Sequence, residues 1–146
     1  MAVKVFSLKK DGDLQLTPNF KVREFACKDG SDKILIDVDF VINFLQKIRD
    51  YFAKPMTINS GHRTEAYNTK IKGSKNSYHI KGMAFDIVIS GVTPLQIAQF
   101  AETLGITGII QYNTFTHIDC RPVKYWARDN AGKITQKTTF KLKQGA

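Results

Sequence analysis

The most constraining feature of this sequence is an acid inside an apolar run. Residues 83–89 read MAFDIVI, which predicts a largely buried β-strand with Asp86 near its centre. A carboxylate in such a strand costs free energy unless it is paired with a cation or coordinates a metal. His79 stands seven residues earlier, across Gly82, and imidazole with carboxylate is a common zinc-binding pair. The alternative is an ion pair between Asp86 and a lysine or arginine.

A second histidine extends this pattern. Residues 115–120 predict another strand, and side chains alternate along a strand, so His117 and Asp119 share one face. His79, Asp86 and His117 would form a set of two histidines and one carboxylate. Three protein ligands leave a fourth position open for water, which distinguishes catalytic from structural zinc sites. Zinc lowers the pKa of that water to about 7 and polarises a carbonyl, so the set suits peptide hydrolysis.

The remaining periodicity predicts a single α+β domain. Two main helices are expected: residues 38–52, capped by Asp37, and a helix that begins after Thr93 and ends at Gly105. Strands are expected at residues 56–59, 83–89, 107–112 and 115–120, and a last edge strand is expected in 133–142. A short helix is expected after Thr64. The fold class is therefore a small, mostly antiparallel sheet with two main helices packed on it. The length of 146 residues suits one domain, with residues 1–19 as an extended arm.

The charge balance bears on the partners of the chain. Lysine and arginine exceed aspartate and glutamate, 22 against 13, which gives a net charge of +9. Such a surface favours nucleic acid, anionic lipid or an anionic cell wall. The basic residues are scattered singly or in pairs, so we expect no nucleic-acid partner; salt-sensitive binding to DNA or RNA would indicate one. No apolar run approaches the roughly 20 residues that a membrane span needs, so no membrane span is expected.

Three further expectations concern the compartment and the state of the protein. The first ten residues, MAVKVFSLKK, contain no apolar core typical of a secretory signal, so we expect synthesis in the cytoplasm without a signal peptide. Cys27 and Cys120 could form one disulfide, but two reduced thiols are the expected state. We expect a monomer.

Several motifs together resemble a known family. Residues 77–86 follow the pattern Ser-x-His-x-x-Gly-x-Ala-x-Asp, and His117-x-Asp119 comes later in the chain. Residues 60–64, SGHRT, are similar to the segment that precedes the metal motif in this family. Residues 20–27 resemble its opening segment, especially in small bacterial and prophage members. On these motifs the chain resembles the M15 zinc peptidases, which have the Hedgehog/D-Ala-D-Ala-peptidase fold.

The resemblance covers about residues 20–126 and leaves 127–146 as a C-terminal extension. It implies a Zn²⁺-dependent enzyme that hydrolyses peptide bonds in the D-amino-acid-containing stem peptides of peptidoglycan, as a carboxypeptidase or an endopeptidase. A lysin that reaches the cell wall by phage-type release, or acts on a virion, fits this picture. The implied residue roles are zinc ligation by His79, Asp86 and His117, substrate anchoring by Arg63, and further substrate contacts by Ser77 and His62.

One position departs from the family pattern. Many members carry Glu or Asp three residues before the last histidine ligand as the general base, and here that position is Thr114. Asp119 lies on the same strand face as His117 and is the best-placed acid, either as the base or as a residue that orients a ligand. Glu65 is the next candidate. The missing acid leaves an alternative open, a cell-wall-binding module of the same fold that does not catalyse.

Overall fold

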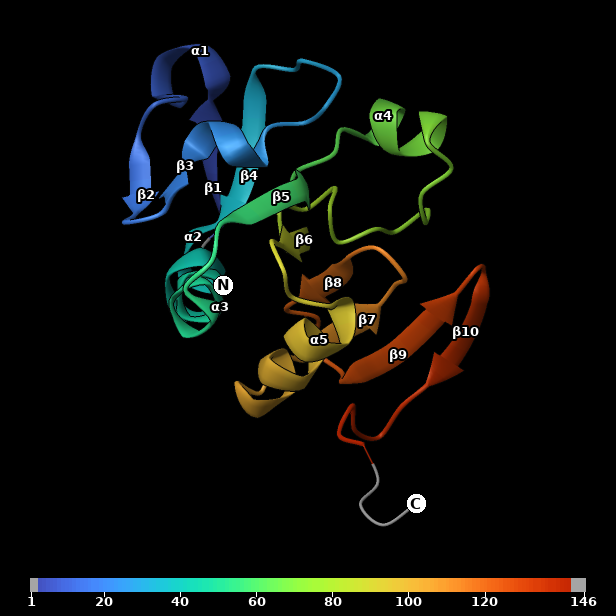
Figure 1. The fold of residues 1–146 in the computed structure, drawn as a ribbon. Helices are drawn as coiled ribbons and strands as arrows, with labels where there is room; N and C mark the ends of the chain where they lie inside the picture. The colour runs from blue at the N-terminus through green and yellow to red at the C-terminus, as the bar shows by residue number, and fades with distance from the viewer. Residues whose placement is uncertain (1–2, 143–146) are drawn as a thin grey trace.

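Six strands form the central sheet of the computed structural model, which describes residues 3–142 (Figure 1). Their order is β10-β9-β7-β8-β6-β5, and each neighbouring pair is antiparallel except β7 and β9, which are parallel. The prediction of a mostly antiparallel α+β fold is thus confirmed. The strands are β5 Met56–Ser60, β6 Ala84–Ile89, β7 Gly108–Gln111, β8 Thr116–Asp119, β9 Tyr125–Asn130 and β10 Lys133–Gln136.

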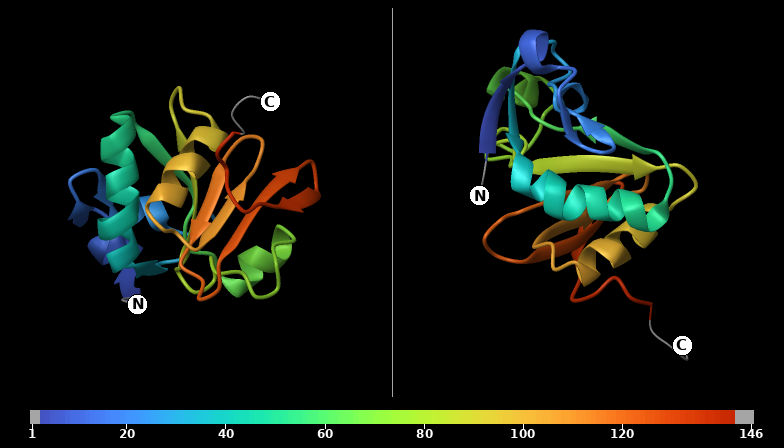
Figure 2. Two further views of the ribbon diagram at one scale, coloured as in Figure 1. Left: turned by 90° about the horizontal axis from the view of Figure 1, so that it is seen from below. Right: turned by 90° about the vertical axis from the view of Figure 1, so that its left-hand side faces the viewer.

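The first main helix runs from residue 38 to residue 52, as predicted. It comprises α2 (Val38–Phe40), a π-helical segment η2 (Val41–Leu45) and α3 (Gln46–Phe52), and the ribbon passes through them continuously (Figure 2). The Asp37 carboxylate accepts a hydrogen bond from the backbone N–H of Phe40 at 3.2 Å, which caps the helix at its start.

The second main helix is α5 (Pro94–Thr103), which also begins where the sequence predicts. Thr93 and Gln96 form a capping box, in which each side chain accepts a hydrogen bond from the other residue's backbone N–H. Gly105 follows the helix with φ of 77°, a conformation that glycine adopts at little cost. The short helix α4 (Glu65–Lys70) is capped by Thr64, again as predicted.

The two helices cover one face of the sheet, and strand alternation leaves the other face for polar groups. Phe85 of β6 packs on the helix side, with its ring centroid 5.2 Å from that of Phe40 and 5.6 Å from that of Phe25. Ile87 and Ile118 are fully buried in the same core. Asp86 lies between Phe85 and Ile87 in the strand, so its side chain points to the opposite face.

The expectation of an extended arm in residues 1–19 is wrong for the described part of that segment. β1 (Val3–Ser7) pairs antiparallel with β4 (Lys33–Asp37), an unpredicted strand that buries Ile34 and Ile36 completely. The pairing joins segments about 30 residues apart, which local sequence patterns do not reveal. The other N-terminal elements are α1 Leu8–Asp11, β2 Gln15–Thr17, β3 Phe20–Lys21 and the 3₁₀ turn η1 Val22–Phe25.

The C-terminal segment forms a hairpin at the edge of the sheet. β9 was not predicted, because its second half, Arg128–Asn130, is polar, yet it lies alongside β7 and leads into β10 through a turn at Ala131 and Gly132. The predicted edge strand in 133–142 is confirmed for residues 133–136 alone. Residues 1–2 of the expected arm and 143–146 of the expected extension lie outside the described residues. Within residues 3–142, no helix combines the length and apolar character needed to cross a membrane.

Candidate metal centre

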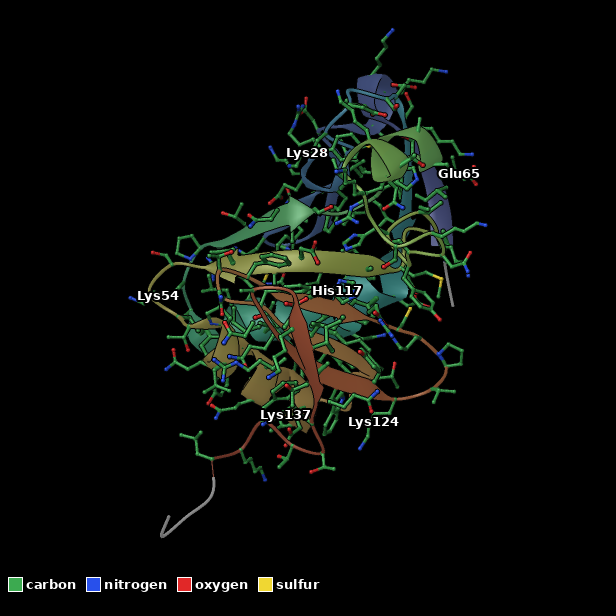
Figure 3. All side chains as sticks on the ribbon, turned by 90° about the vertical axis from the view of Figure 1, so that its right-hand side faces the viewer. Lys28, Lys54, Glu65, His117, Lys124 and Lys137 are labelled. Atoms are coloured by element: carbon green, nitrogen blue, oxygen red, sulfur yellow. The ribbon has the colours of Figure 1, made fainter. Side chains whose placement is uncertain are left out.

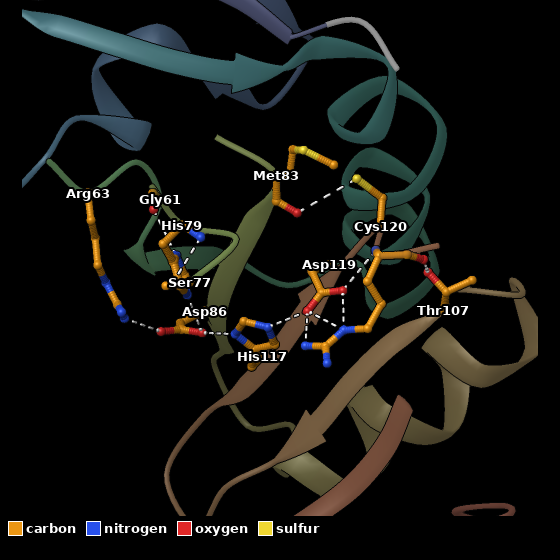
Figure 4. A network of polar contacts seen from close by, with 11 residues as sticks. Gly61, Arg63, Ser77, His79, Met83, Asp86, Thr107, His117, Asp119 and Cys120 are labelled. Carbon is orange, nitrogen blue, oxygen red and sulfur yellow. Dashed lines mark hydrogen bonds and ion pairs between the residues drawn. The ribbon is translucent and has the colours of Figure 1, made fainter. Parts of the chain in front are cut away.

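Strand pairing brings two of the predicted ligands together. In the antiparallel register of β6 and β8, Asp86 lies directly opposite His117. His79 joins them from the loop that leads into β6. All three residues are buried, and one potential ligand atom from each lies within 4.8 Å of the others. Figure 4 shows the three side chains converging.

The loop around His79 fixes the orientation of its ring. Nδ1–H donates a hydrogen bond to the carbonyl oxygen of Gly61 at 2.8 Å, so Nε2 faces Asp86 at 3.2 Å. The hydroxyl of Ser77 accepts a hydrogen bond from the backbone N–H of His79 at 3.1 Å. Backbone hydrogen bonding of one imidazole nitrogen is the usual way to hold the other toward a metal.

Asp86 is the centre of the polar network. Its Oδ1 lies 2.9 Å from Nδ1 of His117, and its Oδ2 accepts a hydrogen bond from Nη2 of Arg63 at 3.2 Å. Burial raises the pKa of Asp86, but its close contacts with the imidazoles of His117 and His79 outweigh burial and hold the pKa below its usual range. The carboxylate is therefore ionised. Of the two environments predicted for Asp86, an ion pair with arginine and a cluster of metal-ligand type, the structure contains both.

Arg63 is held in place by three different groups. Besides Asp86, its Nε donates to the hydroxyl of Ser60 at 3.0 Å and its Nη1 donates to Oδ1 of Asn68 at 3.2 Å. A Cβ at Gly73 would overlap the Asn68 side chain, so the absence of a side chain there makes room for this support. The guanidinium is thus preorganised beside the candidate ligands.

A second arginine–aspartate pair lies on the other side of His117. The Asp119 carboxylate accepts a hydrogen bond from Nε2–H of His117 at 2.7 Å and from Nε and Nη2 of Arg121 at 2.8 and 2.5 Å. It has no exposed surface. A Cβ at Gly108, the cross-strand neighbour of Asp119, would overlap the carboxylate, so only glycine fits there.

These contacts set the charge and direction of His117. Burial lowers the pKa of His117, but its hydrogen bonds to Asp119 and Asp86 outweigh burial and raise the pKa to about 9. Burial likewise raises the pKa of Asp119, and the hydrogen bonds from Arg121 and His117 reverse that effect and lower it. Nδ1 of His117 faces Asp86 and Nε2 faces Asp119, so Nδ1 is the nitrogen directed toward a metal.

An open cavity of about 420 Å³ adjoins the three ligands. Arg63 and Ser77, two of the predicted substrate contacts, line it together with Tyr78, Tyr112, Phe115 and Arg121. His62 does not line this cavity, contrary to the expectation. It is 6% exposed, and its backbone N–H donates to the carbonyl oxygen of Phe25, which ties the residue to the core side of the loop.

The cavity contains one acid among the described residues that line it, and that acid is Asp86. Thr114 is exposed in the turn between β7 and β8, and Glu65 is exposed on α4; neither lines the cavity. Tyr112 does line it, and burial raises the pKa of its hydroxyl, which therefore stays protonated at neutral pH.

The sequence interpretation missed Arg121 and Gly108. Arg121 follows Asp119 by two residues, so the same period of two that placed Asp119 beside His117 could have placed Arg121 on that face. The signal for Gly108 is weaker, because its role depends on a strand pairing that local sequence does not show. The donor chemistry of the cluster fits zinc: two imidazoles and a carboxylate, each with a hydrogen-bond partner on an atom that would not bind the metal.

Comparison with known proteins agrees with this geometry. Residues 18–119 match the family described as Peptidase M15. The chain belongs to the peptidase M15 family. The matched segment contains all three candidate ligands of this M15 chain, as well as Arg63 and Asp119, and it confirms the resemblance inferred from the motifs.

Curated relatives of the M15 chain include two named peptidases of different specificity. A peptidoglycan L,D-endopeptidase MepK of Escherichia coli K12 is 32% identical over 80 residues, which are 50% of this chain and 44% of the relative. A zinc D-Ala-D-Ala carboxypeptidase of Streptomyces albus G is 30% identical over 84 residues, 54% of this chain and 33% of the relative. A probable MepK of Haemophilus influenzae is 46% identical over 55 residues, 36% of this chain and 30% of the relative. The matches span less than half the length of each of these relatives.

Proposed function

We propose that this chain is a zinc-dependent peptidase that hydrolyses peptide bonds in the D-amino-acid-containing stem peptides of peptidoglycan. The observation that carries the proposal is the cluster of His79, Asp86 and His117 beside an open cavity. Family membership supports a peptidase, and the names of the relatives support peptidoglycan as the substrate and zinc as the metal.

The residues around the cluster have separate tasks in this proposal. Zinc bound by the three ligands would supply Lewis-acid polarisation of the scissile carbonyl. Arg63, held by Ser60 and Asn68, presents its guanidinium at the cavity wall, where a planar cation suits a substrate carboxylate or carbonyl oxygen. Tyr112 offers a protonated hydroxyl that can donate a hydrogen bond to the substrate.

Asp119 acts on His117 in this proposal, and Arg121 acts on Asp119. Both carboxylate oxygens of Asp119 already accept hydrogen bonds, and the side chain is fully buried. A residue so placed orients the His117 ring and increases its basicity toward a metal, whereas a general base needs access to water in the cavity. Of the two roles predicted for Asp119, we therefore propose the orienting one.

Metal removal combined with product analysis tests the proposed function. The purified protein is stripped with a chelator, reloaded with one equivalent of zinc, and incubated with purified peptidoglycan, with His117→Ala as the matched control. We expect peptide fragments, detected by mass spectrometry, from the zinc-loaded protein alone. Equal product formation by the stripped protein would contradict the proposal.

One observation favours a second candidate function, a wall-binding module without catalysis. Asp86 is the sole acid that lines the cavity in the described part of the chain, so no free carboxylate is at hand to accept a proton. The same experiment separates the two functions, because a binding module would sediment with peptidoglycan and release no fragments. Action at the cell wall, by phage-type release or on a virion, stays a prediction.

A further inference from the structure

The carboxylates outside the metal cluster are poorly placed to give a proton to the leaving group. Cleavage of a peptide bond needs a proton at the departing nitrogen, because an amine anion is too basic to leave. Glu65 lies on α4, apart from His117 (Figure 3). Asp119 has no exposed surface, and Thr114 holds the position of the acid that many family members carry. The donor must therefore be another group that lines the metal cavity.

Most other protonated side chains in the cavity wall are already engaged. Arg63 and Arg121 are each paired with a buried aspartate, and a guanidinium keeps its protons at neutral pH. The ring of Tyr78 has two cations against it, since Lys81 Nζ and the Arg121 guanidinium each lie 5.2 Å from its centroid. The hydroxyl of Tyr112, by contrast, makes no hydrogen bond to another residue within the range 3–142, so its proton is free to be donated.

Strand pairing puts Tyr112 on the same face of the sheet as the candidate ligands. Ile110 of β7 lies directly opposite His117 of β8, and Tyr112 follows Ile110 by two residues. Side chains two residues apart share a face, and both Ile110 and Tyr112 line the metal cavity. Two residues cover about 7 Å along a strand, which leaves room for a substrate between the ligands and the Tyr112 ring.

The Tyr112 ring is held in place by the turn that follows it. It stacks on the ring of Phe115, with centroids 4.4 Å apart and planes 14° apart. The backbone N–H of Tyr112 donates to the carbonyl oxygen of Phe115 at 3.0 Å, which closes the turn. Thr114 lies within this turn, so the phenol projects from the same loop as the position that lacks the acid. A donor fixed in this way needs little rearrangement when the reaction occurs.

The surroundings of the hydroxyl keep its proton on the oxygen at neutral pH. Burial raises the pKa of Tyr112, the negative charges of Asp86 and Asp129 raise it further, and the positive charge of Arg63 opposes them. The influence of Asp86 and Arg63 agrees with the position of the hydroxyl in the metal cavity. A nitrogen that is losing its bond to carbon is far more basic than a phenolate, so it can still take this proton.

We infer that Tyr112 is the catalytic proton donor of this site, in place of a carboxylate. The inference rests on the proposed function. The oxygen of water adds to the carbonyl carbon, and one proton of the water passes to solvent. As the C–N bond breaks, its electron pair stays on nitrogen, which takes the Tyr112 proton. The phenolate then takes the proton of the hydroxyl group on the carbonyl carbon, which becomes the product carboxylate, and Tyr112 is restored.

Two substrates that differ in the leaving atom test the inference with the zinc-loaded protein. Product analysis on peptidoglycan first identifies the bond that is cleaved; a synthetic peptide with that bond is then compared with its thioester analogue, in which S replaces N–H. Tyr112→Phe keeps the ring that stacks on Phe115 and removes the hydroxyl alone. We expect kcat for the amide to fall by at least about 100-fold, with KM changed by less than about threefold. We expect kcat for the thioester to change by less than about threefold, because a thiol of pKa about 8.5 leaves without a proton.

Two further variants accompany this measurement. Phe115→Leu removes the stacking partner and keeps the hydroxyl, so we expect a loss of about fivefold on the amide and little change on the thioester. Tyr51→Phe is the matched control, since Tyr51 is 63% exposed on α3 and does not line the metal cavity. The zinc content of all three variants should equal that of the wild type.

The outcomes separate this inference from the proposed function. Equal amide turnover by Tyr112→Phe and wild type would overturn the inference and leave the proposed function intact. Equal losses on amide and thioester would overturn the donor role, because a general disturbance of the site lowers both rates. A larger loss on the amide in Tyr78→Phe or Lys72→Gln than in Tyr112→Phe would also overturn it. An absence of any product from the zinc-loaded wild type would contradict the proposed function itself.

Discussion

Two arginine–aspartate pairs flank His117, and they differ in what the aspartate can reach. Arg63 pairs with Asp86 and Arg121 pairs with Asp119, and both carboxylates are buried and contact the same imidazole. Asp86 also reaches His79 and lines the cavity, whereas Asp119 has no exposed surface and does not line it. An arginine–aspartate pair therefore suits metal binding on the Asp86 side of the His117 ring. On the Asp119 side, the same kind of pair suits orientation of the ring.

The two pairs together produce an alternation of charge across the site. With His117 protonated, the line Arg63, Asp86, His117, Asp119, Arg121 reads plus, minus, plus, minus, plus (Figure 4). Each buried charge has an opposite neighbour, which offsets the cost of taking it out of water. A zinc ion beside Asp86 would take the place of the His117 proton in this alternation.

Loss of a ligand should have the largest effect on the Asp86 side. We expect His79→Ala or His117→Ala to abolish stoichiometric zinc binding, because two protein ligands hold the metal far less tightly than three. Metal analysis after dialysis measures this directly. Full zinc content in both single variants would contradict the ligand assignment.

The next largest effect should come from the Asp119 side. Asp119→Asn keeps the shape of the side chain but removes the anionic acceptor of His117 Nε2–H, so we expect zinc affinity to weaken by roughly 10–100-fold. Competition with a coloured chelator measures the affinity, and Asp39→Asn, an exposed acid on α2, is the control.

The opposite pattern is expected if Asp119 is the general base. In that case Asp119→Asn would leave zinc affinity unchanged and lower turnover by at least about 100-fold.

Arg63→Lys should affect turnover and spare the metal. Lysine keeps the charge near Asp86 but cannot reproduce the planar fork that contacts Ser60 and Asn68 and that would bind the substrate, so we expect kcat/KM to fall by roughly tenfold. Zinc content and turnover are measured on the same preparation. Equal turnover by Arg63→Lys and wild type would exclude Arg63 as the substrate anchor.

Arg121→Lys should give a smaller effect on the opposite side of the ring. One cation still neutralises Asp119, but the paired hydrogen bonds from Nε and Nη2 are lost, so we expect zinc affinity to weaken by about threefold. A loss larger than that of Asp119→Asn would contradict the proposed order of action, in which Arg121 works through Asp119.

Glu65→Gln should have the smallest effect. Glu65 is exposed on α4 and does not line the cavity, so we expect turnover to change by less than about twofold. A large loss would identify Glu65 as a proton acceptor that reaches the site when substrate binds.

The ligands could be predicted because their signals are local. Asp86 stands out as an acid within an apolar strand, and the face shared by His117 and Asp119 follows from the period of a strand. The caps at Asp37 and Thr93 likewise depend on a few neighbouring residues, and the structure confirms both.

The features that the sequence did not predict arise from contacts between distant segments. β1 depends on β4, and β9 lies alongside β7, so neither strand is evident from its own residues. The SGHRT segment suggested that His62 points into the cavity with Arg63, but adjacent residues of an extended loop face opposite sides, and only Arg63 points there. Asp119 was placed correctly beside His117, while its pairing with Arg121 became clear from the structure.

The most direct test of the central claim is a crystal structure of the zinc-loaded protein, with anomalous diffraction recorded at the zinc edge. We expect one zinc bound by Nε2 of His79, the Asp86 carboxylate and Nδ1 of His117, with Nε2 of His117 still donating to Asp119. Zinc bound instead by Nε2 of His117 and the Asp119 carboxylate would contradict the division of roles between the two aspartates.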